Sequence, residues 1–330
     1  MIRERFLLPG LIAASLLAII AACFLGSTSL PIDRLLGALF GGADAGDRLV
    51  VWQIRLPRAL AAYIVGAALG ISGAALQGLL RNPLAEPGVL GVSASASLMA
   101  TFSLYYGIAS ITPWALPIAA IIGALSATAV ITLAALRTQS VVTLILIGVG
   151  LSSFAGAAMS LLMNLAPNPF SLSDMINWML GSVANRSFDE IMLAGPFILA
   201  GALILFTTRR GLSALTLGEE AASGIGLDLQ RQRILTVVGA GLATGGAVAL
   251  AGAIGFVGIV APHIIRPLVG HDPARSLLPS ALLSGLILVL ADIFIRLVPT
   301  NSELKLGVVA ALIGAPAFVW IAMQSRAGHE

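Results

Sequence analysis

Two small groups of charged residues have the types and spacing for recognition chemistry. In Arg55-Leu-Pro-Arg58, two guanidinium groups come just before an apolar segment. Guanidinium groups bind carboxylates in a two-pronged geometry, so the pair could dock acidic side chains of a partner; contact with lipid phosphates is the alternative. Asp292 and Arg296, four residues apart, could pair along one helix, or Arg296 could join the same basic surface. These three arginines are the candidate docking residues.

A third candidate is the polar segment 209–233. It contains the motif residues Gly218, Glu219, Glu220, Ala221 and Gly226. Alanine-rich sequence broken by glycines predicts short helices lying along a membrane surface. Apolar side chains in the segment could insert into a groove on a cytoplasmic partner: Leu215, Leu217, Ile225 and Leu227. A solvated connector with frayed helices is an equally open interpretation.

The stretch Arg81-Asn-Pro-Leu-Ala-Glu-Pro-Gly88 predicts a tight turn on the inner side. Two prolines and a glycine favour the turn, and an Arg81–Glu86 ion pair could close it. We expect a structural role for this stretch rather than a chemical one.

Several classes of protein are excluded by the residues that the sequence lacks. Lys305 is the only lysine and follows no glycine-rich loop, so the chain has no P-loop and any ATP hydrolysis belongs to another polypeptide. The single Cys23 and the three histidines, His263, His271 and His329, have no metal-ligand spacing. The net charge of +3 is small and its arginines are scattered, which argues against nucleic-acid binding. We therefore expect neither an enzyme nor a bound metal or cofactor.

The elements that must position these residues are membrane helices. Hydrophobic residues make up 58% of the chain and charged residues only 10%, and no charge occurs from Pro87 to Leu136. A bilayer core needs about 20 apolar residues per helix. Residues 1–330 are therefore predicted to form one all-α transmembrane domain, with ten spans near 7–27, 59–80, 88–107, 114–136, 141–165, 190–208, 233–252, 256–270, 276–297 and 306–324. The segment 256–270 contains two prolines, which favours a short or broken helix there.

The distribution of basic residues predicts the orientation. With both termini cytoplasmic, 11 of the 18 basic residues fall on the inner side. The 209–233 segment is then cytoplasmic, whereas Arg55, Arg58 and Arg296 lie on the outer side.

A weak internal repeat is also present. A shift of 179 residues aligns Gly66–Ala74 with Gly245–Ala253 and Pro83 with Pro262. Small residues let helix backbones approach closely in lipid. Because five spans separate the copies, they would point in opposite directions, as in many transporters. Chance similarity among abundant glycines and alanines is the alternative.

The ionisable residues bear on the energy source of a transporter. We expect Glu86, Glu219, Glu220 and Asp228 in inner loops, with no pair of carboxylates in mid-membrane. An ion-coupled secondary carrier usually keeps such groups along its path. That class, and a permease for free metal ions, are the less favoured alternatives.

The longest motifs resemble one family. Arg55 to Gln77, Arg81 to Ser93, Leu250 to His263, Leu290-Ala-Asp292 and Leu306 to Pro316 resemble the FecCD-type permeases of iron-siderophore, haem and cobalamin ABC importers. The resemblance covers nearly the whole chain in order.

The resemblance implies the type II ABC importer permease fold in the bacterial inner membrane. A second permease copy or a paralogue would complete the pathway, lined by the fifth and tenth spans. Cytoplasmic ATPase subunits would bind the coupling residues Gly218, Glu219, Glu220, Ala221 and Gly226. A soluble substrate-binding protein would dock at Arg55, Arg58 and Arg296. The cargo implied is an iron chelate, as siderophore or haem, or cobalamin.

Overall fold

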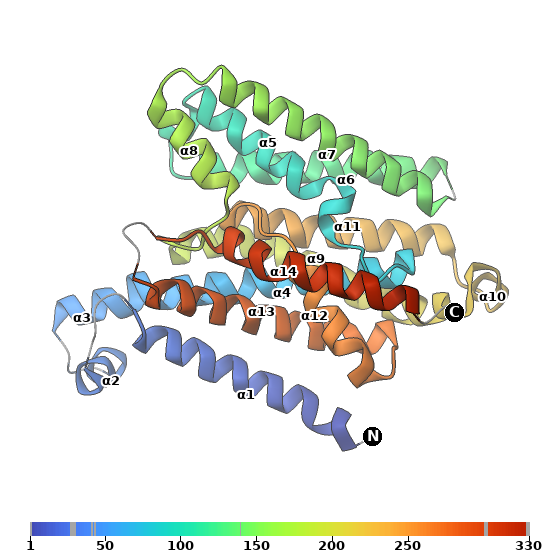
Figure 1. Ribbon diagram of the computed structural model, residues 1–330, viewed down its shortest axis with the longest axis horizontal. Coiled ribbons are helices and arrows are strands. Elements are labelled where there is room, and N and C mark those ends of the chain that lie inside the picture. Colours follow the sequence, from blue (N-terminus) through green and yellow to red (C-terminus); the bar gives the residue numbers. More distant parts are fainter. Residues whose placement is uncertain are drawn as a thin grey trace.

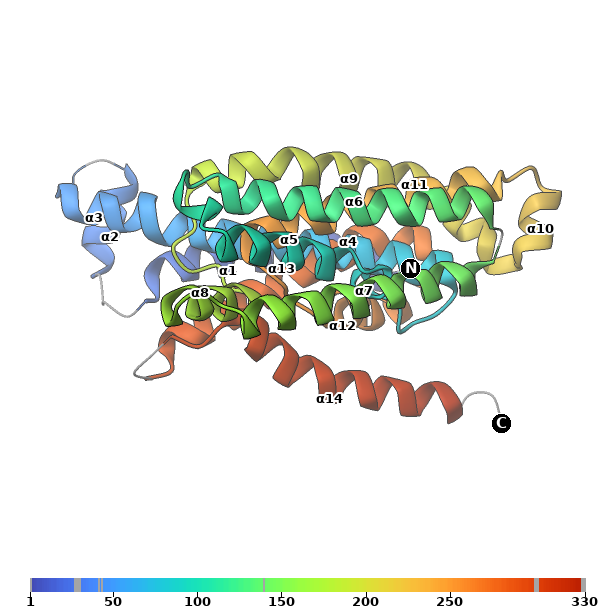
Figure 2. The ribbon, with the colours of Figure 1, turned by 90° about the horizontal axis from the view of Figure 1, so that it is seen from above.

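The apolar segments of the chain form helices that lie side by side in a bundle (Figures 1 and 2). The computed structural model describes residues 2–26, 31–40, 42, 44–138, 140–299 and 303–327, and the regular elements among them are all helical. Each predicted span overlaps one of these helices: α1 (Ile2–Phe24), α4 (Leu56–Leu80), α5 (Val92–Tyr105), α6 (Ala115–Arg137), α7 (Val141–Asn164), α9 (Phe188–Ala214), α11 (Leu229–Ala251), α12 (Val257–Ile265), α13 (Pro273–Leu297) and α14 (Leu306–Ala327). Residue 27, the predicted end of the first span, lies outside the described residues.

Not all of these helices can cross a bilayer on their own. Within the described residues, seven segments are long and apolar enough to do so. Helix α5 has 14 residues and α12 has nine, which at 1.5 Å per residue gives lengths of about 21 and 14 Å. The prediction of a short helix near 256–270 is confirmed, whereas the predicted full-length span at 88–107 was too long.

Both short helices follow a non-helical connection that the bundle shelters. Helix α4 ends at Arg81, which adopts a left-handed conformation, and the chain returns through residues 82–86 and the 3₁₀ turn η2 (Pro87–Leu90) before α5 begins. Helix α11 ends at Gly252, whose φ of 71° and ψ of −168° favour glycine, and residues 253–256 lead into α12. Non-helical backbone at membrane depth is tolerated where protein surrounds it or it lines a cavity.

Further short elements occur outside the predicted spans. Near the N-terminus, α2 (Ile32–Phe40) is followed by α3 (Ala45–Leu49) and by the π-helical turn η1 (Val50–Arg55), which continues into α4. Between α7 and α9 lies α8 (Pro169–Met179), where Asn168 caps the first turn and Pro169 occupies its first position. The 3₁₀ turn η3 (Ile108–Ser110) lies between α5 and α6, and the 3₁₀ turn η5 (Arg266–Val269) directly follows α12. In the polar segment, η4 (Leu215–Leu217) and α10 (Glu219–Gly224) form short helices as predicted.

Helices α4 and α11 lie at the centre of the bundle. In the 18-residue apolar stretch of each of these two segments, 78% of the residues are buried. The corresponding share is 22% for α1, 17% for α7 and 28% for α9. The two central helices run in opposite directions (Figure 1). This is the arrangement that an inverted repeat requires.

The glycine motif of α4 allows close helix packing. A methyl group on Gly66 would overlap the backbone of Ser284 in α13, and one on Gly73 would overlap the carbonyl of Gly258 in α12. At the end of α11, a side chain on Gly252 would overlap the carbonyl of Trp178. Both copies of the repeated motif therefore lie where another part of the chain approaches closely.

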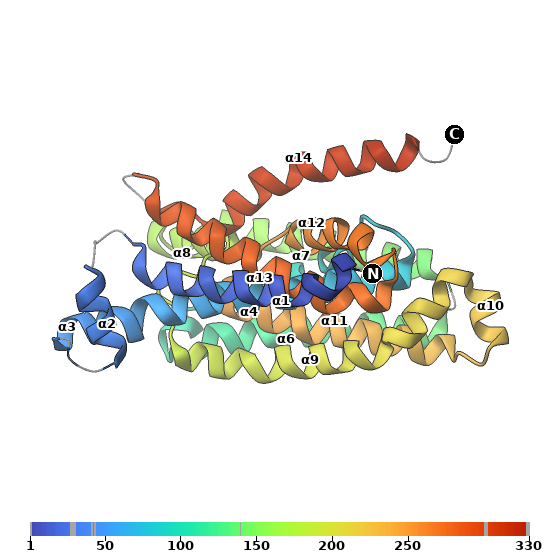
Figure 3. The same cartoon turned by 90° about the horizontal axis from the view of Figure 1, so that it is seen from below.

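The bundle has two distinct ends, which we name after α3 and α10. Helices α2 and α3 lie at the α3 end and α10 lies at the opposite, α10 end (Figures 1 and 3). Helix α1 begins and α14 ends toward the α10 end (Figure 3). Both ends of the helical chain therefore point to the same side as the 209–233 segment.

Candidate functional site

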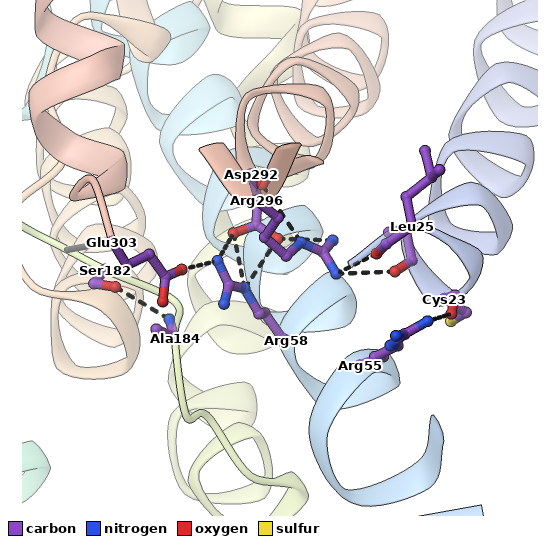
Figure 4. A network of polar contacts seen from close by, with 10 residues as sticks. Cys23, Leu25, Arg55, Arg58, Ser182, Ala184, Asp292, Arg296 and Glu303 are labelled. Atoms are coloured by element: carbon purple, nitrogen blue, oxygen red, sulfur yellow. Dashed lines mark hydrogen bonds and ion pairs between the residues drawn. The ribbon is translucent and has the colours of Figure 1, made fainter. Parts of the chain in front are cut away.

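Arg58 and Asp292 form the centre of a charged cluster at the α3 end (Figure 4). The Nε of Arg58 donates to Asp292 Oδ1 at 2.9 Å and Oδ2 at 3.2 Å, and its Nη2 donates to Oδ1 at 2.7 Å. Glu303, just before α14, accepts from the same Nη2. Arg296 Nη2 lies 2.9 Å from Asp292 Oδ2, which confirms the pairing predicted from their spacing. We call Arg55, Arg58, Asp292, Arg296 and Glu303 the arginine cluster.

Two arginines of the cluster also hold the end of α1. Arg55 Nη1 donates to the carbonyls of Cys23 and Phe24, each at 2.9 Å. Arg296 Nη1 donates to the carbonyls of Ala22 at 2.9 Å and Leu25 at 3.1 Å. The last carbonyls of a helix have no partner within it and carry partial negative charge. The two guanidinium groups therefore satisfy these carbonyls and anchor α1 to α4 and α13.

The three predicted docking residues thus lie together, but their side chains are largely engaged within the chain. Arg55 is 4% exposed, and the side chains of Arg58 and Arg296 are 12% and 7% exposed. The side chain of Glu303 is 41% exposed. Sequence reasoning missed Glu303, because nothing in its local sequence links it to a residue 245 positions away. Docking by these arginines stays a prediction.

The coupling residues predicted from the sequence surround α10. Gly218 and Gly226 have φ values of 98° and 91°, a region that favours glycine, and they mark the two ends of the α10 turn. Glu219 accepts from Arg233 Nη2 of α11 at 2.8 Å, and the Arg233 side chain is only 5% exposed. Glu220 and Ala221 are exposed. Glu219 therefore holds α10 to the bundle, whereas its neighbours face outward.

Two apolar side chains project from this segment. Leu217 and Ile225 are each 68% exposed, whereas Leu215 is buried and Leu227 is half-buried. A groove of about 460 Å³ is lined by the end of α6, the start of α11 and part of the segment, with Arg137, Ser223 and Asp228 among its residues. The segment thus offers both exposed apolar side chains and part of a polar groove.

A second pocket, which is partly open, lies between α4, α5, α7 and the connections before α5 and α12. Its volume is about 400 Å³, and Leu69, Glu86, Ser97, Met159 and Ala253 are among its lining residues. The lining thus combines apolar groups and thioethers with hydroxyl groups and one carboxylate.

The predicted ion pair between Arg81 and Glu86 is wrong. Its Oε2 accepts from the backbone N–H of Phe256 at 3.1 Å, whereas Arg81 is exposed. Because Glu86 lines the same pocket as Leu69, a residue near the middle of α4, it lies deep in the bundle rather than in an inner surface loop.

The described residues contain no group of three or more His, Cys, Asp or Glu side chains that could hold a metal ion. His329 lies outside the described residues, and Cys23 is buried.

Comparison with known proteins identifies the family. Residues 13–324 match the model of the FecCD transport family. The chain is 40% identical to the uncharacterized ABC transporter permease YvrB of Bacillus subtilis, over 94% of this chain and 91% of the relative. It is 42% identical to the vitamin B12 import permease BtuC of Citrobacter koseri, over 86% and 85% of the two chains.

The fold has a solved counterpart. A structure described as a metal-chelate type ABC transporter in an inward-facing conformation superposes with a TM-score of 0.86 at 29% identity, covering 97% of this chain and 99% of that one. This match confirms the type II ABC importer permease fold. The chain therefore belongs to the FecCD transport family and is a permease of that family's ABC importers.

Proposed function

We propose that this permease moves a metal chelate, either cobalamin or an iron complex of a siderophore or haem, into the bacterial cytoplasm. The observation that carries the proposal is family membership together with relatives described as vitamin B12 and metal-chelate transporters. The partly open pocket beside α4, α5 and α7 supports it, because its lining is dominated by apolar and uncharged groups. Such a lining suits a cargo whose metal is already enclosed by its own ligand.

The cargo can be tested with labelled compounds. Cells expressing the permease with its neighbouring ATPase and binding protein are given radiolabelled cobalamin, ferric siderophore, haem or free ferric, zinc or manganese ions. We expect ATP-dependent uptake of one chelate and none of the free ions. Uptake of a free ion alone, or uptake that survives ATP depletion and collapses with an ionophore, would contradict the proposal.

The α10 segment is proposed as the contact with a cytoplasmic ATPase subunit. Leu217 and Ile225 are exposed on this segment, and apolar side chains of this kind can enter a partner's surface. We expect Leu217→Asp to abolish co-purification of the ATPase, because it places a charge in the contact. The control is Ile111→Asp in the connection between α5 and α6, an exposed apolar residue outside this segment and outside the membrane-spanning helices. Equal loss in both variants would point to misfolding rather than to a lost contact.

Variants of the two glutamates of α10 distinguish a role in coupling ATP hydrolysis to transport from a role in attaching α10 to the bundle. Glu219→Gln weakens the 2.8 Å bond to Arg233 and should loosen α10 on the bundle. Glu220→Gln alters only an exposed side chain. Both are expected to lower uptake relative to ATPase activity, but only Glu219→Gln should speed hydrogen exchange in α10. Normal coupling in both variants would argue against this role.

The α3 end is proposed as the docking surface for a soluble binding protein, facing outward. Glu303 is the exposed carboxylate of the arginine cluster, so it competes with a partner's carboxylate for Arg58. We expect Glu303→Gln to strengthen binding-protein association and Arg58→Lys to weaken it. Both effects should shrink at high salt.

Asp174→Asn on α8 is the matched control for that experiment, because it removes an exposed negative charge outside the cluster. If Asp174→Asn acts like Glu303→Gln, the effect reflects general charge and not docking at Arg58.

We further propose that the α10 end, with both termini, is cytoplasmic. The excess of basic residues predicted on this side supports the orientation. In a Cys23→Ala background, Ser223→Cys should react with an impermeant maleimide only in permeabilised cells. Asn168→Cys, just before α8, should react in intact cells. The reverse pattern would invert the orientation.

A second permease, identical or paralogous, is proposed to complete the pathway. Helices α7 and α14 are the fifth and tenth predicted spans, which the family resemblance assigns to the pathway, and both carry large apolar side chains that the single chain leaves exposed, among them Phe154 and Leu312. Cysteines at these positions should crosslink between copies if the chain forms a homodimer, and crosslink to a different permease if it does not.

A further inference from the structure

Phe256 has a backbone conformation that is rare for a bulky residue. Its φ is 66° and its ψ is −29°, in the left-handed region, and it forms the N-cap of α12. An aromatic residue keeps such a conformation only when its surroundings hold it there. One group that does so is Glu86, whose carboxylate accepts from the Phe256 N–H at 3.1 Å.

The side chain of Phe256 reaches α14. Its ring lies 6.3 Å from the ring of Phe318, centre to centre, and meets it edge to face at 73°. Its Cβ lies so close to Gly314 that a methyl group on Gly314 would overlap it. The absence of a side chain at Gly314 therefore creates the space in which Phe256 sits.

Helix α14 diverges from the bundle toward its C-terminal end. It starts beside the other helices and its later turns stand away from them (Figures 2 and 3). Its described neighbours include α12 and α13. The contact at Gly314 is thus a place where the position of α14 can be set.

We propose that Glu86 is a positioning residue that holds Phe256 as a clamp on α14. The carboxylate fixes the left-handed turn, the turn directs the ring against Phe318, and α14 pivots at Gly314. The clamp joins the connection after α4 to the connection after α11 and both of them to α14. A role of the clamp in transport rests on the proposed function, whereas the contacts that form the clamp do not depend on it.

The test measures the position of α14 in the purified full-length chain. In a Cys23→Ala background, spin labels are placed at Leu203→Cys on α9 and Val319→Cys on α14, both exposed positions. Pulsed electron paramagnetic resonance on the labelled chain, diluted with excess unlabelled chain, then gives the distribution of distances between the two labels of one copy. We expect a narrow distribution for the parent protein and for Glu86→Gln, because an amide oxygen still accepts from the Phe256 N–H. Glu86→Leu removes the acceptor and should broaden the distribution.

A second pair of variants leaves Glu86 intact, so the test remains decisive if Glu86→Leu does not fold. Gly314→Ala should displace α14 in the parent chain but cause no further displacement when Phe256→Gly has removed the overlapping Cβ. Gly150→Ala on α7 is the control, since a methyl group there would have nothing within 4 Å.

An unchanged distribution in Glu86→Leu would overturn the clamp, and so would equal displacement by Gly314→Ala with and without Phe256. Because the measurement needs no ATPase, binding protein or cargo, such a failure leaves the transport proposal standing. Conversely, a clamp confirmed in a chain that transports no chelate would count only against the proposed function.

Discussion

Removing Asp292 is expected to be one of the most damaging single changes in the chain. Its side chain is 1% exposed and pairs with two arginines whose side chains are 12% and 7% exposed. Asp292→Ala leaves both guanidinium groups without their shared carboxylate. Breaking a buried ion pair by deleting one partner costs about 3–5 kcal/mol, because the remaining charge stays buried. That is roughly two to three and a half powers of ten in the unfolding equilibrium.

The assay is equilibrium unfolding of the purified chain in mixed micelles titrated with SDS, followed by tryptophan fluorescence. Arg275→Ala is the comparison, since the Arg275 side chain is 64% exposed and its Nε lies 3.5 Å from Asp272. Exposed pairs contribute about 0–1 kcal/mol. A loss for Asp292→Ala no larger than that for Arg275→Ala would refute the reasoning.

A second variant separates the two causes of the loss. If the damage comes from the buried charge left behind, Arg58→Met should restore part of the stability in the Asp292→Ala background. If it comes from lost packing alone, the double variant should be less stable than either single one. Recovery is the outcome that the buried charges predict.

Three further outcomes follow from local geometry. Gly73→Ala should destabilise the bundle by about 1–3 kcal/mol in the same unfolding assay, because its methyl group would overlap the α12 backbone; Gly150→Ala should cause no loss. Gly218→Ala should cost about 1–3 kcal/mol locally, since φ 98° with ψ 159° is a glycine conformation, and hydrogen exchange in α10 should speed up; Gly224→Ala, in open space, should leave it unchanged. Ser187→Ala removes half of the capping box of α9 and should cost about 1 kcal/mol, seen as faster exchange in the first turn.

The sequence predicted the helices better than it predicted their lengths. Long uncharged runs favour membrane helices, and all ten predicted segments overlap a helix, although only seven described segments are long and apolar enough to span a bilayer. Helix α5 is shorter than predicted because the connection at 81–91 enters the bundle. Its glycine and proline residues predict a turn, but they do not indicate how deep in the membrane the turn lies. Helix α8 was missed because a search for long apolar runs passes over 11 residues that include Ser, Asp and Asn.

The candidate sites were predicted in part. The pairing of Asp292 with Arg296 follows from their spacing on one helix, and a short helix at 219–224 follows from alanines between glycines. The contacts of Arg58 with Asp292 and of Glu86 with Phe256 join residues 234 and 170 positions apart. Only the packing of α4 against α13 and α12 brings such residues together, and no local pattern encodes that packing.

The two abbreviated helices constrain how the chain enters the membrane during synthesis. Neither 14 nor nine residues can bridge a hydrocarbon layer of about 30 Å. The non-helical connection before each of them is sheltered only once its packing neighbours are in place: α6 and α7 for α5, and α4 and α13 for α12. Insertion of this protein is then a cooperative event among groups of helices rather than a succession of independent ones.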